Sequence, residues 1–360
     1  MIKSVHGGNI DEICRVYNID RESITDFSAN INPLGLNLNI KNSIIDNLSD
    51  VVNYPDITYY ELKEEISKFE EIKKENIFLG NGAAECIFNL ARALNPKKTL
   101  LLAPSFSEYE EGVKSVYGDI EYFLLKEEDD FKLTDELIEK LDESIDLLFI
   151  CNPNNPTGVI TDGIYLEKLI KRAEKLNIFV AVDESFLDFV DNKDKYSVMK
   201  LIYKYSNLII VKSLTKFYAI PGLRIGFGVT NNEDLLRKID RVTMSWNVNT
   251  LASIAAVCGL KEITYNKESI DYVNTEREYL YNKLKDMKSL KVFSPSVNFI
   301  FFKIEEDMDL KMELLKYGIL IRSCNNYIGL DDKFYRIAVR TREENNKIIN
   351  TLNKVFNDER

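Results

Sequence analysis

Short apolar runs that alternate with helical patterns are the feature that most constrains the fold of this 360-residue chain. Five runs are rich in Leu, Ile, Val and Phe along their whole length rather than at every second position. A strand of that kind is buried on both faces, as in a parallel sheet covered by helices. We therefore predict an α/β region with a mainly parallel sheet. The predicted strands are Thr99–Ala103, Asp146–Cys151, Ile178–Val182, Leu208–Lys212 and Arg224–Val229.

The last third of the chain has a different composition. After about Asn249, lysine- and glutamate-rich helical segments precede three further strand patterns, and a last helix is predicted from Thr341, where Thr-Arg-Glu-Glu has the spacing of a capping box. This predicts a smaller α+β domain. We divide the chain into an N-terminal arm or lid (1–40) that contributes to the small domain, a large domain (41–250) and the small domain (251–360). The later strands are predicted at Val297–Ile304, Ile319–Arg322 and Tyr335–Val339, and helices of the large domain at Ala84–Leu94 and Tyr165–Leu176.

Charge and composition exclude several classes of protein. The formal net charge of −11 and the pI of about 5.0 argue against nonspecific nucleic-acid binding and against an anionic membrane partner. The five cysteines show no CxxC spacing, and His6 is the only histidine, which argues against a histidine-based metal site or a Ser-His-Asp triad. No run of about 18 apolar residues exists. We expect an enzyme-sized cytoplasmic protein with no metal, nucleic-acid or membrane partner.

One lysine lies between a predicted strand and a glycine-containing turn. Lys216 closes the run Ser-Leu-Thr-Lys that begins at Ser213, and Arg224 follows eight residues later. A lysine amine in such a place can form a Schiff base with a cofactor aldehyde, while neighbouring hydroxyl and guanidinium groups hold the cofactor phosphate. Taken alone, the run is more often an ordinary strand end, so the upstream residues decide between the two interpretations.

Three upstream motifs supply possible partners for such a cofactor. Asp183 ends an apolar strand, where a carboxylate needs a cation; a pyridinium nitrogen is one such partner, and a helix cap or a structural ion pair is the alternative. Asn155 lies in Asn-Pro-Asn-Asn-Pro-Thr-Gly, an extended turn that can direct its amide at a ring oxygen. Gly82 opens a predicted helix whose bare N–H groups favour an anion, although a lone glycine turn is weak evidence.

In this order and spacing the residues resemble those of the fold-type I pyridoxal 5'-phosphate (PLP) enzymes, the aspartate aminotransferase superfamily, over nearly the whole chain. The resemblance implies a large domain with a mainly parallel, seven-stranded type of sheet between helices, a smaller α+β domain, and a homodimer with a shared active site. It implies that Lys216 carries PLP and that Asp183 pairs with the ring nitrogen. The other implied contacts are Asn155 with the ring hydroxyl, Phe106 stacked on the ring, Ser213, Arg224 and the backbone of Gly82 and Ala83 with the phosphate, and Tyr54 with the phosphate of the neighbouring subunit.

Within the superfamily the chain resembles two branches, the histidinol-phosphate aminotransferases and the L-threonine-O-3-phosphate decarboxylases of cobalamin biosynthesis. Many relatives have a tyrosine three residues after the aspartate, and this chain has Phe186. Phe186, the segment around Lys216, the opening His-Gly-Gly-Asn and the segment that starts at Arg322 favour the decarboxylases. The resemblance then implies that a phosphorylated amino acid is held by His6, Gly7, Asn30, Asn155, Arg322 and Arg336.

The predicted reaction is the decarboxylation of L-threonine O-3-phosphate to (R)-1-amino-2-propanol O-2-phosphate. L-Serine O-phosphate is an alternative substrate, because it lacks only a β-methyl group whose contact is worth about 1 kcal/mol. A histidinol-phosphate-type aminotransferase is the alternative reaction, and a PLP-fold protein used for binding or regulation without turnover is a third possibility. The residues alone leave open which Cα bond breaks, because that depends on how the substrate is rotated.

Overall fold

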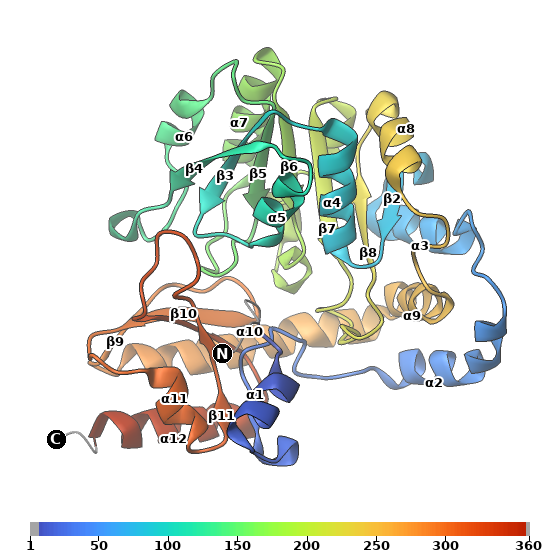
Figure 1. The fold of residues 1–360 in the computed structure, drawn as a ribbon. Coiled ribbons are helices and arrows are strands. Elements are labelled where there is room, and N and C mark those ends of the chain that lie inside the picture. Colours follow the sequence, from blue (N-terminus) through green and yellow to red (C-terminus); the bar gives the residue numbers. More distant parts are fainter. Residues whose placement is uncertain (1–6, 358–360) are drawn as a thin grey trace.

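The computed structural model describes residues 7–357, and its centre is a seven-stranded sheet (Figure 1). All neighbouring strands in this sheet are parallel except β8, which runs antiparallel to both of its neighbours. The mainly parallel sheet predicted from the apolar runs is therefore confirmed. In spatial order the strands are β2 (Ile77–Gly80), β8 (Gly226–Val229), β7 (Leu208–Ser213), β6 (Phe179–Asp183), β5 (Leu147–Cys151), β3 (Lys98–Ala103) and β4 (Asp119–Leu124).

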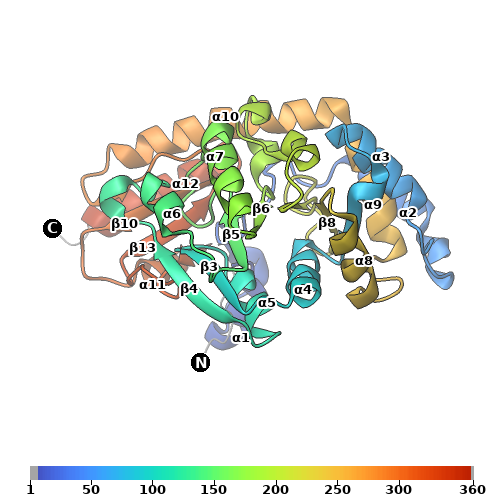
Figure 2. The same cartoon turned by 90° about the horizontal axis from the view of Figure 1, so that it is seen from above.

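Helices cover both faces of this sheet (Figure 2). Along β5, Leu147 and Phe149 pack into the hydrophobic cluster on one face, and Leu148 and Ile150 pack into the cluster on the other. Because both faces are buried, the central strands need apolar residues at every position. One face is covered by α4 (Ala83–Leu94), α5 (Glu108–Lys114) and α8 (Glu233–Val242); the other by α3 (Tyr60–Glu70), α7 (Gly163–Lys175) and α9 (Thr250–Lys261), with α6 (Asp135–Lys140) at its border.

A second, four-stranded antiparallel sheet lies toward the C-terminus. Its strand β10 contributes Phe299 and Phe301 to a core shared with the large sheet, and Ile300 and Phe302 to a separate core against the C-terminal helices. The predicted capping box is confirmed, since the amide N–H of Thr341 donates to Glu344 Oε2 at 3.1 Å. The elements are β9 (Leu290–Val292), β10 (Phe299–Ile304), β12 (Arg322–Ser323) and β13 (Phe334–Ala338), with α10 (Ile263–Lys285), α11 (Leu310–Leu315) and α12 (Arg342–Asn357).

The N-terminal segment joins this second region. It forms α1 (Ile10–Tyr17) and β1 (Thr25–Asp26), which pairs in parallel with β11 (Ile319–Leu320), and it continues into α2 (Leu38–Asp46). The single strand predicted at Ile319–Arg322 is therefore wrong. The chain changes partners there, pairing first with β1 and then, as β12, with β13.

Four strands in the described residues were not predicted from the sequence, and the shortest of them, β1, has only two residues. Strand β4 lies at the edge of the large sheet and is exposed or only half-buried along its length, so it has no continuous apolar run. Strands β2 and β9 are only four and three residues long, too short to give a clear pattern. Among residues 7–357, no helix combines the length and the apolar character needed to cross a lipid bilayer.

Candidate active site

The carboxyl ends of the parallel strands β5, β6 and β7 gather the predicted site residues at one edge of the large sheet. Cys151 on β5 is in register with Asp183 on β6, and Asp183 is in register with Val211 on β7. The turn that carries Asn155 follows β5, and Lys216 follows β7. Side chains that leave parallel strands at this edge converge, which is where open α/β sheets bind ligands.

Asp183 is buried at the end of β6, where two donors hold its carboxylate. The amide N–H of Ser185 donates to Oδ1 at 2.8 Å, and the hydroxyl of Tyr109 donates to Oδ2 at 2.7 Å. Burial, together with the negative charge of Asp183, raises the pKa of Tyr109 well above its usual value, so the phenol keeps its proton and remains a donor. Tyr109 was not predicted from the sequence.

Lys216 is half-buried, and its amine lies 5.2 Å from the centroid of the Phe186 ring. That ring packs edge-on against Phe299, with 5.1 Å between centroids. Burial lowers the pKa of Lys216, Arg224 lowers it further, and Asp183 opposes both. Within residues 7–357 no carboxylate forms an ion pair with this amine. A lysine whose neutral form is favoured in this way is suited to attack a carbonyl carbon.

The start of α4 forms a cradle for an anion beside Lys216. A Cβ added to Gly82, whose φ is +83°, would lie 2.3 Å from Arg224 Nη2, and a Cβ added to Gly226 would lie 2.4 Å from the backbone N of Ala83. The guanidinium and the first turn of the helix are therefore brought together by residues without side chains. Next to them, Ser213 Oγ lies 2.9 Å from a threonine hydroxyl, that of Thr215. Such a set of donors suits a phosphate group.

On the opposite side of the site, a buried arginine from the second sheet reaches the first. Arg336 on β13 donates hydrogen bonds to Asn155 Oδ1 and, at 2.9 Å, to the carbonyl oxygen of Ser28. The amide of Asn30, with its oxygen turned toward the guanidinium, lies 3.2 Å from Nη1. A Cβ added to Gly7 would lie 3.5 Å from Nη2. The structure thus brings Gly7, Asn30 and Asn155 together around Arg336.

A second arginine lies beside the first. Arg322 on β12 is the direct cross-strand partner of Arg336, and it donates to Asn326 Oδ1 at 2.7 Å. Burial lowers the pKa of Arg336, and the charge of Arg322 contributes to that shift. Burial and Arg322 also lower the pKa of Lys311, on α11. Lys311 was not predicted, because no motif links it to Arg322. Three cations so close together favour a ligand with more than one negative charge.

Phe106, Tyr54 and His6 complete the set of predicted residues. Phe106 packs edge-on against Tyr109, with 5.7 Å between ring centroids, and therefore borders the site. Tyr54 is 78% exposed and stacks on Trp246 with 4.6 Å between centroids; the structure shows no contact between Tyr54 and the other predicted residues in the part of the chain that it describes. His6 lies outside the described residues.

The residues present fit PLP. An amine with a lowered pKa, a buried carboxylate, an aromatic ring and an anion cradle lie at one strand edge, and each matches one chemical group of that cofactor: the aldehyde, the ring nitrogen, the ring face and the phosphate.

Known proteins are similar to this chain in sequence and in fold. The family model described as aminotransferase class I and II matches residues 22–352. The chain belongs to this family. Threonine-phosphate decarboxylase of Salmonella typhimurium is 35% identical over 357 residues, which are 99% of this chain and 98% of that protein. The solved structure of histidinol-phosphate aminotransferase from Clostridium acetobutylicum is also 35% identical, with a TM-score of 0.86, and the match covers 92% of this chain and 99% of that one.

A third relative combines two activities in one chain. An adenosylcobalamin biosynthesis bifunctional protein of Leptospira interrogans is 36% identical over 98% of this chain and 41% of its own length. The comparisons confirm the superfamily and the two branches that the residues resemble. Because the decarboxylase and the aminotransferase are equally identical to this chain, identity alone does not choose the reaction.

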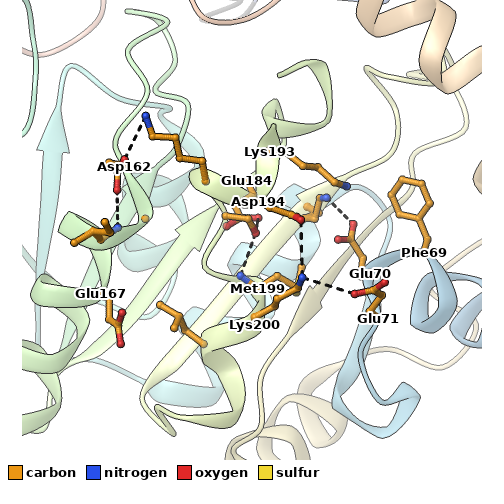
Figure 3. A pocket seen from close by; sticks show the side chains of 16 residues that line it. Phe69, Glu70, Glu71, Asp162, Glu167, Glu184, Lys193, Asp194, Met199 and Lys200 are labelled. Atoms are coloured by element: carbon orange, nitrogen blue, oxygen red, sulfur yellow. Dashed lines mark hydrogen bonds and ion pairs between the residues drawn. The ribbon is translucent and has the colours of Figure 1, made fainter. Parts of the chain in front are cut away.

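In this member of the aminotransferase class I and II family, a cavity of about 520 Å³ lies near the site strands (Figure 3). Asp183 and Lys216 do not line it, whereas their neighbours Glu184 and Lys212 do. The Glu184 carboxylate is fully buried and accepts hydrogen bonds of 2.8 Å from the amide N–H of Val198 and from the Ser197 hydroxyl. Burial raises its pKa to about 7, against the opposing effect of Lys212.

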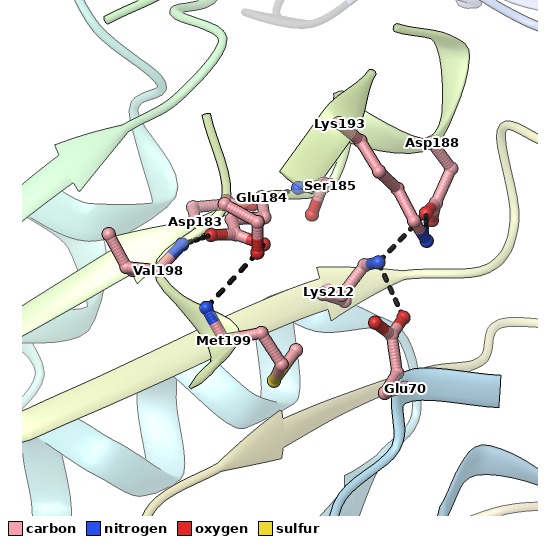
Figure 4. A network of polar contacts seen from close by, with 10 residues as sticks. Glu70, Asp183, Glu184, Ser185, Asp188, Lys193, Val198, Met199 and Lys212 are labelled. Carbon is pink, nitrogen blue, oxygen red and sulfur yellow. Dashed lines mark hydrogen bonds and ion pairs between the residues drawn. The ribbon is translucent and has the colours of Figure 1, made fainter. Parts of the chain in front are cut away.

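A buried ion network closes the inner side of this cavity (Figure 4). The amine of Lys212 is 1% exposed and lies 2.5 Å from Glu70 Oε1 and 2.8 Å from Asp188 Oδ1. Lys193 adds a second cation, 3.1 Å from the same Asp188 oxygen. Burial alone would lower the pKa of Lys212, but Asp188 and Glu70 raise it above its ordinary value. The network joins α3, β7 and the turn after β6, and all of its charges are matched within the protein.

Proposed function

We propose that this protein is a PLP-dependent decarboxylase that converts L-threonine O-3-phosphate into (R)-1-amino-2-propanol O-2-phosphate for cobalamin biosynthesis. The observation that carries the proposal is a pair of buried arginines, Arg322 and Arg336, which are cross-strand partners on β12 and β13. The names of the Salmonella and Leptospira relatives, a threonine-phosphate decarboxylase and an adenosylcobalamin biosynthesis protein, support it.

The two arginines match the two anionic groups of a phosphorylated amino acid. Two guanidinium groups side by side in a buried site attract a ligand that carries negative charge. Arg336 is held by Asn155 and Ser28, so its position is fixed before the substrate arrives. We assign Arg336 to the carboxylate and Arg322, with the predicted residues His6, Gly7 and Asn30, to the remainder of the substrate and its phosphate. This local positive charge lets a protein of net charge −11 bind an anion.

We assign PLP to the carboxyl ends of β5, β6 and β7. When bound, PLP offers an aldehyde to amines and accepts the electron pair released when a bond at Cα breaks. Lys216 would bind its aldehyde, Asp183 would hold the proton on its ring nitrogen, Asn155 would contact its ring hydroxyl and Phe106 would cover one ring face. Ser213, Arg224 and the backbone of Gly82 and Ala83 would donate hydrogen bonds to its phosphate. Lys216, once released by the substrate amine, would take up the proton that the substrate ammonium group gives up and would return it to Cα from Nζ.

The choice of reaction follows from how the arginines orient the substrate. Loss of carbon dioxide requires the Cα–carboxylate bond to stand perpendicular to the cofactor ring, whereas transamination requires the Cα–H bond there. We propose that Arg322, by holding the phosphate, turns the carboxylate out of the ring plane toward Arg336. Phe186 supplies no hydroxyl beside Lys216, so this chain lacks the phenol that many aminotransferases place at that position.

The reaction can be tested with purified protein, PLP and L-threonine O-3-phosphate without added oxo acid. We expect carbon dioxide and aminopropanol phosphate in equal amounts, with no pyridoxamine phosphate. Pyridoxamine phosphate, or turnover only with a 2-oxo acid, would instead identify a histidinol-phosphate-type aminotransferase. No turnover, with the cofactor still bound to the protein, would support a non-catalytic PLP-binding protein. L-Serine O-phosphate in the same assay measures the contribution of the β-methyl group.

We further propose a homodimer in which Tyr54 reaches the cofactor phosphate of the partner subunit. Tyr54 lies in a segment with many exposed apolar side chains, as expected of a surface that a second copy covers. Light scattering should give twice the mass of the chain, 41.6 kDa, and Tyr54→Phe should weaken PLP binding. The cytoplasmic location predicted from the sequence remains part of this proposal. Exposed apolar residues in this surface are Leu34, Leu36, Leu38, Ile45, Leu48, Val51, Val52, Ile57, Tyr60, Met244 and Trp246.

A further inference from the structure

Among residues 7–357, the hydroxyl of Tyr109 is the one side-chain donor on the carboxylate of Asp183. We propose that Tyr109 is a positioning residue: it fixes the plane of the Asp183 carboxylate so that a free lone pair faces the ring nitrogen of PLP. The inference rests on the proposed function only as far as PLP binding, and not on the identity of the substrate.

The geometry around Tyr109 leaves its hydroxyl little freedom. The ring is 2% exposed and stacks on Phe149, with 4.9 Å between centroids and 11° between the planes. Phe106 packs edge-on against its other side. A ring held between two aromatic side chains presents its hydroxyl in one direction, and that direction is Asp183 Oδ2, 2.7 Å away.

The carboxylate needs this second anchor. Asp183 is the last residue of β6, and its carboxylate can rotate about the side-chain bonds. The amide N–H of Ser185 fixes only Oδ1. With Oδ1 alone held, the carboxylate can rotate about that contact; with Tyr109 on Oδ2, its plane is set. The remaining groups nearby are poor substitutes. The thiol of Cys151 is a weak donor that already contacts the carbonyl oxygen of Pro153 at 3.2 Å, and the Lys216 amine is reserved for the cofactor aldehyde.

A purely structural role would give a different outcome. If Tyr109 only filled the space between α5 and the sheet, its ring would suffice and Tyr109→Phe would resemble the wild type in every cofactor property. A matched deletion elsewhere measures the general cost of losing a tyrosine hydroxyl. Tyr165, on α7 at the other face of the sheet, donates to the carbonyl oxygen of Thr134 at 2.6 Å and serves as that control.

The test is a titration of PLP-free Tyr109→Phe and Tyr165→Phe proteins with PLP, followed by absorption spectra of the loaded proteins. We expect the PLP dissociation constant of Tyr109→Phe to rise about tenfold or more, as for loss of a hydrogen bond to a charged group. Its bound-cofactor absorption should shift, and kcat should fall while KM for the phosphorylated substrate stays the same. Tyr165→Phe should match the wild type in all of these properties.

Equal PLP affinity and equal spectra for Tyr109→Phe and Tyr165→Phe would overturn the inference. If Tyr109→Phe does not fold, 3-fluorotyrosine at position 109 keeps the ring and the hydroxyl but changes the acidity of the donor. A shifted absorption of the bound cofactor then supports the inference, and an unshifted one overturns it. Normal PLP binding without decarboxylation would contradict the proposed reaction but leave the role of Tyr109 testable, because these readouts need no substrate.

Discussion

Two lysines near the end of β7 lie four residues apart, and their surroundings shift their pKa values in opposite directions. Lys212 faces the rear of the site strands, where Glu70 and Asp188 contact its amine and raise its pKa. Lys216 faces the strand edge, where no ion pair holds it among residues 7–357 and where burial and Arg224 lower its pKa. Lys212 is buried and Lys216 is half-buried, and burial acts to lower the pKa of both amines, so burial alone does not explain the opposite shifts.

The difference shows how one strand can carry a structural and a functional charge. Behind β6 and β7 the charges are paired inside the protein, and they join three separate segments of the fold. Within residues 7–357, Lys216 at the carboxyl ends of the strands and Arg336 on the opposite side of the site form no ion pair with a carboxylate, which suits them to bind a ligand. Uncompensated charge in a buried site is a sign of function with a physical rationale.

The largest expected effect is on catalytic activity, which should depend on Lys216 and not on Lys212. Lys216→Ala should lower decarboxylation by more than about 1000-fold, because it removes both the cofactor attachment and the proton carrier. The urea midpoint of the PLP-free variant should equal or exceed that of the wild type, since the lost amine had no ion-pair partner in the described chain. Activity that survives this substitution would show that another group carries the cofactor.

The second effect concerns stability. Lys212→Met keeps the length of the side chain but leaves Glu70 and Asp188 buried without their cation. Breaking a buried ion pair from one side costs about 3–5 kcal/mol, so urea unfolding should show a loss of that size. The kcat of the folded variant should remain that of the wild type. A large fall in kcat without a loss of stability would mean that the rear network takes part in the reaction.

The third effect depends on pH. Native Glu184 has a pKa of about 7, above its ordinary value of 4.5, so between these values the native state holds a proton that the unfolded state has lost. The stabilisation that this proton gives the native state is therefore fully present below pH 4.5. It is lost as the pH rises through 7, and the loss is about 3 kcal/mol in total. Glu184→Gln should remove this part of the slope in unfolding free energy measured from pH 4.5 to 8. An unchanged slope would show that the carboxyl titrates normally.

Much of the site could be predicted from the sequence because its residues follow strand ends in a family order. The apolar runs predicted β5, β6 and β7, and Asp183, Asn155 and Lys216 each lie within a few residues of such an end. In a parallel sheet, those ends meet at one edge. The prediction of these site residues therefore rested on local sequence patterns and on the order of the motifs.

The pairings between distant segments could not be predicted in this way. Tyr109 and Asp183 are 74 residues apart, and Lys212 and Glu70 are 142 residues apart, with no motif to join them. The division of the predicted strand Ile319–Arg322 between two partners also depends on how the N-terminal segment docks. Such contacts arise from topology, and their energies depend on burial that a linear pattern does not contain.

The most direct measurement of the central claim is to locate the amine that carries PLP. The loaded protein is reduced with borohydride, digested, and its peptides are sequenced by mass spectrometry. The account predicts a stable pyridoxyl group on Lys216 and none on Lys212, whose amine is held by Glu70 and Asp188. Modification of Lys212, or of any lysine other than Lys216, would contradict it.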